Sequence, residues 1–578
     1  MSSCPGSRSV CPSLNHFHHR SSRHHFHGTR FNLTDRRSQT CRLYQAGVTT
    51  VVIGSFVHSI TSETLEFIED GMLVFDPAGR IIGLEKQRKS DEDWSRKSGV
   101  LKSLVERQWA VNGDERLVRF VRLRTGEFLI PGFVDTHTHA VQYPNVGIGQ
   151  QYELLGWLKN VTFAEEQKYA CEAYARRMFS KVVRRLLNVG TTTCSYFSSI
   201  HLSAAKVLAS VCHEAGQRAL VGKCNMDRND AFEAYKEDSV EHSIRDTIQL
   251  IDYVRQHCTT ESEQPYSSLT PPSSIGSASK LSVEEENRRT DEPEGHQLAL
   301  VQPILTPRFA ISCTDELLNS LGQLLEADPS LRLQTHLCES KFEIAHTLAL
   351  FPGYKSYTSI YDRFNLLTSR TILAHCVHLE EAELALVTQR GCGLSHCPSS
   401  NFNLKSGICP VKSLLEQGVQ KIGLGTDVSG GYGIGILSSI RDATVAGKAI
   451  SFRTETDTSS LSIANLVYMA TLGGARVCGL EDRIGNFVVG KEFDGLLIQT
   501  GACKATDEMT MIEDLVEDWI PFSSNIYEEG MNPNFFIDEF DPKLNLERLL
   551  EKFLFAGDDR NIGSVFVKGR VVGGVRPI

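Results

Sequence analysis

Two histidines two residues apart, His137 and His139, end an apolar run within the segment FVDTHTHAVQYP, residues 133–144. Alternate residues of a strand face the same side, so both imidazoles could reach one ion. An isolated pair of this kind is more often structural. His336 in QTHLCES and Asp427 in GLGTD offer a third imidazole and a carboxylate. Three neutral imidazoles and one carboxylate suit Zn²⁺, with one position kept for water.

Short strands that alternate with amphipathic segments would have to position these residues. The clearest helical segment, residues 164–188, has apolar residues at positions i, i+3 and i+4. Eight apolar segments have the composition of strands: residues 127–137, 190–197, 218–227, 300–309, 331–337, 370–377, 391–397 and 421–427. Eight such βα repeats predict an α/β protein with a (β/α)₈ TIM barrel, which we expect over residues 131–484.

The side chains capable of chemistry stand at the ends of these predicted strands. They are His137, His139, Arg308, His336, His375, His396 and Asp427. In (β/α)₈ barrels the active site lies at the carboxyl-terminal face, in the loops that follow the strands. We therefore expect these distant residues to converge at one barrel mouth. His396 is either a hydrogen-bonding partner of the metal cluster or an ordinary buried histidine.

Strand-like segments also flank the predicted barrel on both sides. Residues 49–59 and 71–85 precede it and residues 557–574 follow it, each short and interrupted by turn residues. We expect both ends of the chain to form one small β-sandwich domain, from residues 46–130 and 485–578, with a terminal helix. The charged segment 86–118 is expected to be a long loop.

Two segments differ in composition from the rest. Residues 1–45 are rich in histidine, serine and arginine, which predicts a disordered tail, although mitochondrial transit peptides share the arginine-rich, acid-poor bias. Residues 259–295 are rich in serine and proline and then in charge, which predicts a disordered insertion. Because the insertion precedes a barrel strand, it should leave the barrel away from the mouth. We expect activity to survive its removal.

Composition limits the class of protein. The 578 residues suffice for a large core and more than one domain. The formal net charge of −10 argues against binding to duplex nucleic acid, and no apolar run approaches the roughly 18 residues of a membrane span. The 16 cysteines include no CxxC pair, which is typical of buried thiols in a reducing compartment. HExxH and GxSxG signatures are missing from the sequence.

Longer motifs surround the candidate residues, among them PGFVDTHTHAVQYP, TPRF, QTHLCES, GTDVSGGY and GDDRNI. With these motifs the chain resembles the amidohydrolase superfamily and, within it, the guanine deaminase family. The likeness runs from about Val48 to the C-terminus and leaves out the tail and the insertion. The HxH and Asp motifs are common to the superfamily, whereas HxxQYP, TPRF, GTDVSGGY and GDDRNI are specific to guanine deaminases.

The resemblance implies a cytoplasmic, homodimeric hydrolase that converts guanine to xanthine and ammonia. One zinc per subunit would be held by His137, His139, His336 and Asp427. Glu339 would be the proton shuttle, and His375 with Asp427 would hydrogen-bond the reacting water and help to deprotonate it. The implied substrate contacts are His139, Gln142, Arg308, Phe309, His336, Glu339 and Asp427.

Some of these residues also have a plainer interpretation. Glu339 could be a solvated residue in the first turn of a helix, Arg308 an ordinary ion-pair residue and Phe309 part of the core. An amidohydrolase that deaminates another purine or a pterin would use the same zinc and Glu339, and only its pocket would differ. A non-catalytic scaffold is the third interpretation, but a scaffold could lose the ligands, and this chain keeps them all.

Overall fold

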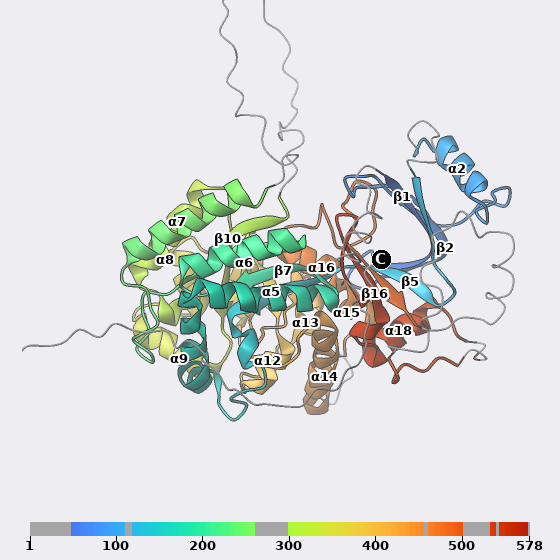
Figure 1. The fold of residues 1–578 in the computed structure, drawn as a ribbon. Coiled ribbons are helices and arrows are strands. Elements are labelled where there is room, and N and C mark those ends of the chain that lie inside the picture. Colours follow the sequence, from blue (N-terminus) through green and yellow to red (C-terminus); the bar gives the residue numbers. More distant parts are fainter. Residues whose placement is uncertain are drawn as a thin grey trace, which may run out of the picture. The chain divides into compact units, whose positions relative to one another are not determined.

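The computed structural model describes residues 48–109, 118–259, 299–454, 460–500, 532–538, 541 and 543–575 (Figure 1). The predicted tail, and the predicted insertion except Thr259, lie outside these residues. Among the helices of the described ranges, none has the length and apolar character that a membrane crossing requires. The described strands form two sheets, one parallel and one built from both ends of the chain.

Eight parallel strands form the barrel in the order β14-β13-β12-β11-β10-β8-β7-β6. Their bounds are β6 Phe133–His139, β7 Thr191–Phe197, β8 Arg218–Gly222, β10 Val301–Pro307, β11 Arg332–Leu337, β12 Thr371–His375, β13 Gly393–His396 and β14 Ile422–Leu424. The first and last strands meet, because Thr136 Oγ1 donates to the carbonyl of Leu424 at 2.9 Å and the amide of Asp427 donates to the carbonyl of His137 at 2.9 Å. The predicted (β/α)₈ barrel is confirmed.

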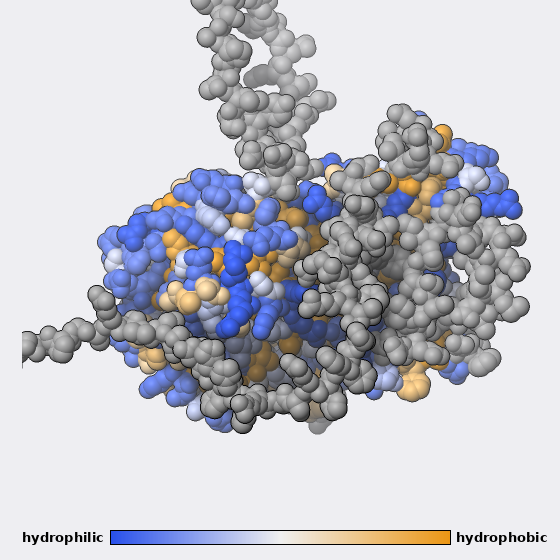
Figure 2. Space-filling view, viewed as in Figure 1, coloured by the Kyte–Doolittle hydropathy of each residue, from blue (hydrophilic) through white to orange (hydrophobic). Residues whose placement is uncertain are grey.

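Helices that connect the strands surround the barrel (Figure 1). They include α5 Glu172–Asn188, α6 Leu202–Ala215, α7 Val240–His257, α8 Asp315–Ala327, α9 Lys341–Leu350, α11 Glu381–Gln389 and α14 Ile436–Thr454. Helix α7 buries Leu250 and Val254, while its outer face is hydrophilic (Figure 2). Such a one-sided apolar stripe at helical spacing makes α5, α7 and α8 fold as helices against the strands.

The first predicted strand, residues 127–137, is wrong as a single element. The structure splits it into β5 Glu127–Pro131, which joins the second sheet, and β6, which opens the barrel. Gly132 lies between them at a point where a Cβ atom would clash with Thr192 Oγ1. Because both halves are apolar and buried, only the pair Pro131 and Gly132 marks the change of sheet in the sequence.

The predicted helix over residues 164–188 is interrupted. Cys171 has a φ of −88° and a ψ of 109°, which is extended backbone, and α5 begins directly after it. A separate short helix, α4 Phe163–Gln167, lies before the break. The apolar spacing continues across Cys171 and therefore hides the interruption.

The charged segment 86–118, expected to be a loop, contains helix α2 Lys97–Glu106, so that expectation is wrong for these ten residues. Val100, Leu101 and Leu104 of this helix are buried and belong to one apolar cluster with strands of the second sheet. A short apolar face within a charged segment is enough to dock a helix, because the charged residues occupy its exposed side.

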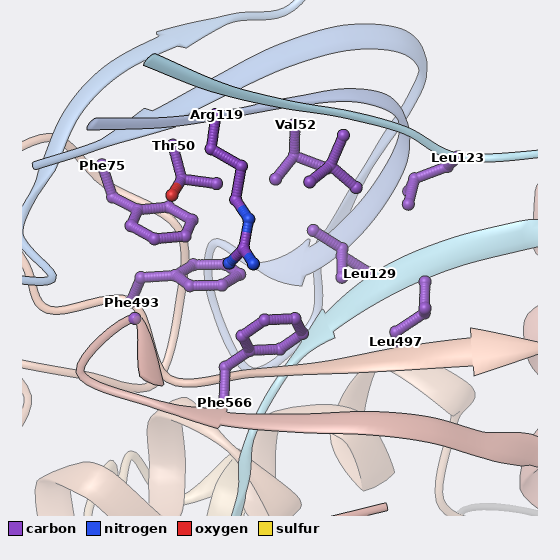
Figure 3. A pocket seen from close by; sticks show the side chains of 11 residues that line it. Thr50, Val52, Phe75, Arg119, Leu123, Leu129, Phe493, Leu497 and Phe566 are labelled. Atoms are coloured by element: carbon purple, nitrogen blue, oxygen red, sulfur yellow. The ribbon is translucent and has the colours of Figure 1, made fainter. Parts of the chain in front are cut away.

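The second sheet has the strand order β17-β16-β15-β5-β1-β2-β3, and β4 also pairs with β1. Its remaining bounds are β1 Thr49–Ser59, β2 Leu65–Phe75, β3 Ile81–Glu85, β4 Val118–Arg122, β15 Gly495–Gln499, β16 Ile562–Val567 and β17 Arg570–Gly573. Phe75 and Phe566 line a cavity of this sheet with Phe493, which stacks on Phe75 at 4.5 Å between ring centroids (Figure 3). The predicted small β domain from both ends of the chain is confirmed. In the sequence, helix α18 Leu546–Ala556 lies between β15 and β16 of this domain.

An ion-pair network joins this β domain to the amino-terminal end of the barrel. Arg218, the first residue of β8, is 1% exposed. Its Nε donates to Oδ2 of Asp494 at 3.0 Å and its Nη2 donates to Oε2 of Glu492 at 2.6 Å. Asp494 Oδ1 also accepts from the amide of Lys568 at 2.8 Å. Loss of the guanidinium would leave the buried carboxylate of Asp494 without its cation, whereas Glu492 would keep its pair with Arg483 at 2.7 Å.

We expect Arg218→Met to lower the free energy of unfolding by about 3–5 kcal/mol, because breaking a buried ion pair leaves an uncompensated charge. The matched control is Arg176→Met, which removes an exposed pair with Glu214 and should cost less than about 1 kcal/mol. Denaturant unfolding followed by circular dichroism measures both variants. Equal effects of the two substitutions would contradict the anchoring role of Arg218.

Candidate active site

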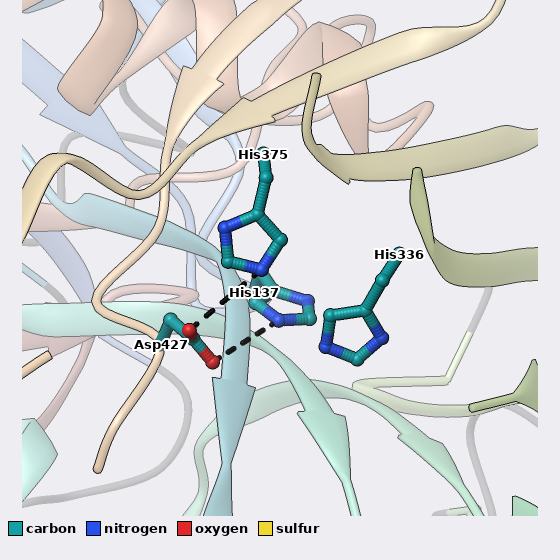
Figure 4. Close-up of side chains that lie close together, drawn as sticks. All are labelled: His137, His336, His375 and Asp427. Carbon is teal, nitrogen blue, oxygen red and sulfur yellow. Dashed lines mark ion pairs between the residues drawn. The ribbon is translucent and has the colours of Figure 1, made fainter. Parts of the chain in front are cut away.

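Side chains from four barrel strands or the loops after them meet at the carboxyl ends of the strands (Figure 4). They are His137 on β6, His336 on β11, His375 at the end of β12 and Asp427 after β14. Each offers one ligand atom, these atoms lie within 4.8 Å of one another, and all four residues are buried. Three imidazoles and a carboxylate at this separation can hold a cation.

His139, which is also on β6, lies in the same cluster. Its Nε2 is 3.2 Å from Nε2 of His336 and 3.4 Å from Oδ1 of Asp427. The same Oδ1 is 3.2 Å from Nε2 of His137. The structure therefore brings together all four residues predicted as metal ligands, with His375 beside them.

The hydrogen bonds of the imidazoles indicate which ring nitrogens are free to bind a metal. Nδ1 of His336 lies 2.5 Å from the backbone carbonyl of Arg308, and a carbonyl only accepts, so Nδ1 carries the proton and Nε2 offers a lone pair. Nδ1 of His137 has no hydrogen-bond partner within the described residues, and Nε2 has only the carboxylate of Asp427 beside it. A buried polar atom normally has a partner, and a metal ion would bind one of these two nitrogens.

Charge separates the histidines of the cluster into two kinds. Burial lowers the pKa of His137, His139 and His336, so these imidazoles are neutral, as metal ligands must be. Burial alone would raise the pKa of Asp427, but its contacts with His137 and His375 outweigh burial and leave the pKa below its ordinary value. The carboxylate is therefore ionised, as a ligand requires.

His375 behaves differently. Burial lowers its pKa, but the carboxylates of Glu339 and Asp427 outweigh burial, and the net pKa is raised. Its Nε2 lies 3.5 Å from Oε2 of Glu339 and 3.7 Å from Oδ2 of Asp427, while Nδ1 is 2.9 Å from Oδ1 of Asn401. A histidine with a raised pKa between two carboxylates is suited to accepting a proton rather than to binding a metal.

Glu339 is a buried residue, not the solvated first-turn residue of the alternative interpretation; it is 2% exposed. Ser406 Oγ donates to its Oε1 at 2.9 Å. Burial raises the pKa of Glu339, which brings proton exchange closer to neutral pH. Its amide donates to Oε2 of Glu343 at 3.1 Å, and burial, followed by the charge of Glu339, raises the pKa of Glu343 to about 8. The site thus holds two carboxyl groups that can carry protons.

The predicted substrate contacts Arg308 and Gln142 share a partner that the sequence analysis missed, Glu166 of α4. Arg308 Nη1 donates to Oε2 of Glu166 at 2.7 Å and Nη2 donates to Oε1 at 3.0 Å. Gln142 Nε2 donates to the same Oε1 at 2.8 Å. The ion-pair interpretation of Arg308 is therefore realised. The pair still lies close to the cluster, because the charge of Arg308 contributes, after burial, to the lowered pKa of His137 and His139.

Aromatic rings pack around the cluster. The ring centroid of Phe309 lies 6.1 Å from that of His336, and Phe309 also belongs to an apolar cluster with Phe163. Phe197, at the end of β7, was not predicted, and its centroid lies 4.9 Å from His137 and 4.6 Å from His139. These rings exclude water and strengthen the electrostatic interactions of the cluster.

Asp135 is a further polar residue of the site that was not predicted. It precedes His137 and His139 at the same alternate spacing on β6, which was the available signal. Its Oδ1 accepts from the amides of His137 and Thr426 at 3.2 and 3.1 Å and so holds β6 against the residue before Asp427. Burial raises its pKa to about 7.

His396, at the end of β13, does not join the cluster. Neither of its ring nitrogens has a hydrogen-bond partner within the described part of the chain. Burial lowers its pKa to about 3, so the ring is neutral. It makes no hydrogen bond to the candidate ligands, which argues against the role of a hydrogen-bonding partner, and its burial agrees with the interpretation as a buried histidine.

A cation site beside proton-carrying carboxyl groups, at the carboxyl end of a (β/α)₈ barrel, is the arrangement of a metal-dependent hydrolase. Residues 128–572 match the amidohydrolase family. The chain is 36% identical to guanine deaminase of Dictyostelium discoideum over 519 residues, which cover 90% of this chain and 97% of that protein. It is 34% identical to guanine deaminase of Homo sapiens over 522 residues, which cover 90% and 95%.

Solved structures agree with these similarities. Guanine deaminase from C. acetobutylicum with guanine bound in its active site superposes with a TM-score of 0.68 at 27% identity, covering 90% of this chain and 99% of that one. Guanine deaminase of E. coli gives the same TM-score and identity over 91% and 100%. The chain belongs to the amidohydrolase family and, within it, to the guanine deaminases.

Metal content distinguishes the candidate ligands from His375. We expect His137→Ala and His139→Ala each to weaken metal affinity by more than about 100-fold, since even outer-shell partners of a metal cost 10- to 100-fold. His375→Asn should retain the metal content of the unaltered protein, because its ring holds a proton. Elemental analysis of the purified variants measures this. If the His139→Ala variant kept its metal and the His375→Asn variant lost it, His375 would be the ligand in place of His139.

Proposed function

We propose that this protein deaminates guanine hydrolytically to xanthine and ammonia, with one zinc ion per subunit. The observation that carries the proposal is the buried carboxyl group of Glu339, with its raised pKa, beside the histidine and aspartate cluster of a chain from the guanine deaminase family. The reaction needs a group of this kind, because the ring must gain a proton as water adds and the leaving amine must gain another.

The donor set fits zinc. His137, His139, His336 and Asp427 would hold the ion, as three neutral imidazoles and one carboxylate in a buried site, and the close approach of their ligand atoms supports this assignment. When bound, zinc lowers the pKa of water toward about 7 and so supplies hydroxide at neutral pH. His375 and Asp427, whose Nε2 and Oδ2 lie 3.7 Å apart, would orient the attacking water, and neutral His375 would accept the proton that the water gives up.

Glu339 would move the remaining protons. As the water oxygen adds to C2 of guanine, the Glu339 carboxyl group gives its proton to N3, and it then takes a proton from the added water. It passes this proton to the C2 amine, which leaves as ammonia when the C–N bond breaks. The first proton of the water then returns from His375 to Glu339, which restores the starting state. The raised pKa of Glu339 suits both transfers, because the group must give and regain a proton at neutral pH.

The purine would be held by the donors next to the cluster. Arg308 keeps N–H groups beyond those that pair with Glu166, and an arginine matches the O6 and N7 edge of guanine. Gln142 would bond a further polar atom of the same edge, and Phe309 would pack against the ring. His139, His336, Glu339 and Asp427 would line the side of the pocket that faces C2.

A cytoplasmic homodimer also belongs to this proposal. The described cysteines are all free, and all of them except Cys171 are buried, which suits a reducing compartment. The dimer rests on the family resemblance alone. Light scattering of the purified protein after size exclusion tests it, and a monomer would contradict it.

Purified protein should convert guanine to xanthine, and removal of the metal with a chelator should abolish the conversion. Ultraviolet absorbance follows the reaction directly. Zinc-loaded, folded protein that leaves guanine unchanged but deaminates another purine or a pterin would contradict the proposed substrate. Failure with all of them would favour the scaffold interpretation.

We expect Glu339→Gln to lower kcat by about 10²- to 10⁴-fold while metal content stays unchanged, because the variant loses the proton-carrying group and no candidate ligand. Steady-state kinetics with guanine and elemental analysis measure the two effects. Glu381→Gln, on the exposed first turn of α11, is the matched control and should leave kcat unchanged. A Glu339→Gln enzyme with normal kcat would remove Glu339 from the mechanism.

A further inference from the structure

Glu166 is a fully buried carboxylate that the proposed reaction does not use. It belongs to α4 and is 0% exposed, whereas its neighbour Glu165 is partly exposed and pairs with Lys168 at 2.6 Å. An ionised carboxylate is removed from water only where strong partners compensate for the lost hydration. The partners of Glu166 are Arg308 and Gln142, which come from separate parts of the barrel mouth.

The carboxylate fixes the orientation of the Gln142 amide. Gln142 Nε2 donates to Glu166 Oε1 at 2.8 Å, and Gln142 Oε1 accepts from the amide of Ser429 at 3.2 Å. A carboxylate only accepts and a backbone N–H only donates, so the two ends of the side-chain amide cannot exchange. Gln142 is thereby left with one further N–H on its nitrogen.

The same carboxylate fixes the guanidinium of Arg308. Its two terminal nitrogens donate to separate oxygens of Glu166 at 2.7 and 3.0 Å, which sets the plane and the position of the fork. A guanidinium has five N–H donors and no acceptor, so three N–H groups remain after this pairing. Together, Arg308 and Gln142 present spare N–H donors.

The two residues that carry these donors adjoin the candidate metal cluster through the backbone. The carbonyl of Arg308 is 2.5 Å from Nδ1 of His336, and Gln142 follows His139 by three residues. A purine whose C2 faces the cluster would therefore meet this donor edge with another part of its ring. Because the edge is held by a buried charge pair, it cannot rearrange to suit a different ligand without breaking that pair.

We propose that Glu166 is a specificity-determining positioning residue, which fixes Arg308 and Gln142 as a donor edge and so selects purines with an oxo group at C6. This inference rests on the proposed function. Guanine offers two acceptors, O6 and N7, to such an edge. 2,6-Diaminopurine carries the same C2 amine as leaving group but has an amino group at C6. The N–H donors of this amino group would face the N–H donors of Arg308 and Gln142. A site with fixed, buried hydrogen-bonding groups rejects a ligand that leaves them unpaired.

The test compares guanine with 2,6-diaminopurine in the Glu166→Gln variant. The new carboxamide replaces one acceptor oxygen with an NH2 donor, which would face an N–H donor of Arg308 or Gln142, and it leaves Arg308 without its counter-charge. The donor edge therefore loses the bonds that fix its geometry. We expect kcat/KM for guanine to fall about 10- to 100-fold, mainly through KM, and the guanine preference to fall at least about 10-fold. Glu165→Gln is the matched control and should change neither value.

Two more variants separate positioning from a general loss of structure. Gln142→Met should also reduce the guanine preference, and the double variant with Glu166→Gln should lose less than the sum of the single effects, because both act through one edge. Glu166→Asp keeps the charge but shortens the side chain by one methylene. Should Glu166→Gln fail to fold, Glu166→Asp is expected to reduce the preference at least about 3-fold on the same grounds.

The outcomes distinguish this inference from the proposed function. Unaltered protein that does not deaminate guanine would contradict the proposed function itself. Active unaltered protein, with Glu166 variants that lose guanine and 2,6-diaminopurine turnover equally, would overturn the selectivity role alone. Additive effects of the Glu166 and Gln142 substitutions would overturn it as well.

Discussion

Closure of the barrel between its first and last strands is the constraint on which the site depends. The amide of Asp427 bonds the carbonyl of His137, and the carboxylate of Asp135 accepts from the amides of both His137 and Thr426. These bonds bring the end of β6 against the chain after β14, so imidazoles and a carboxylate from the two ends of the barrel share one buried volume. The opposite end of the barrel, where Arg218 anchors the β domain, contributes to the stability of the fold rather than to catalysis.

Burial then gives similar residues different roles. Burial lowers the pKa of His137, His139 and His336 and keeps them neutral. The pKa of His375 is raised instead, because this ring lies between the carboxylates of Glu339 and Asp427. The carboxylate of Asp427 is held ionised by its histidine contacts, while burial favours the protonated form of Glu339. The surroundings thus separate the pKa values of neighbouring groups. In this way a few residue types can provide both metal ligands and proton carriers in one site.

The sequence predicts the barrel and the candidate ligands because buried parallel strands are short apolar runs whose last residues all reach one face. It does not reveal that the run ending at His137 changes sheet at Gly132, since both halves are equally apolar. Glu166 could not be found either. In the sequence it is one of two adjacent glutamates in a helical segment, and its role depends on Arg308, which is 142 residues away. The separate character of His375 depends on distances to carboxylates that no spacing reveals.

Barrel closure should build one metal site from His137, His139, His336 and Asp427, with His375 beside it as a proton carrier. Diffraction at the zinc absorption edge, from crystals of zinc-loaded protein, can locate the ion. We expect a single anomalous peak in contact with those four residues, with His375 outside bonding distance. A peak bound by His375 in place of His139, or a peak away from this cluster, would contradict this assignment of the metal ligands.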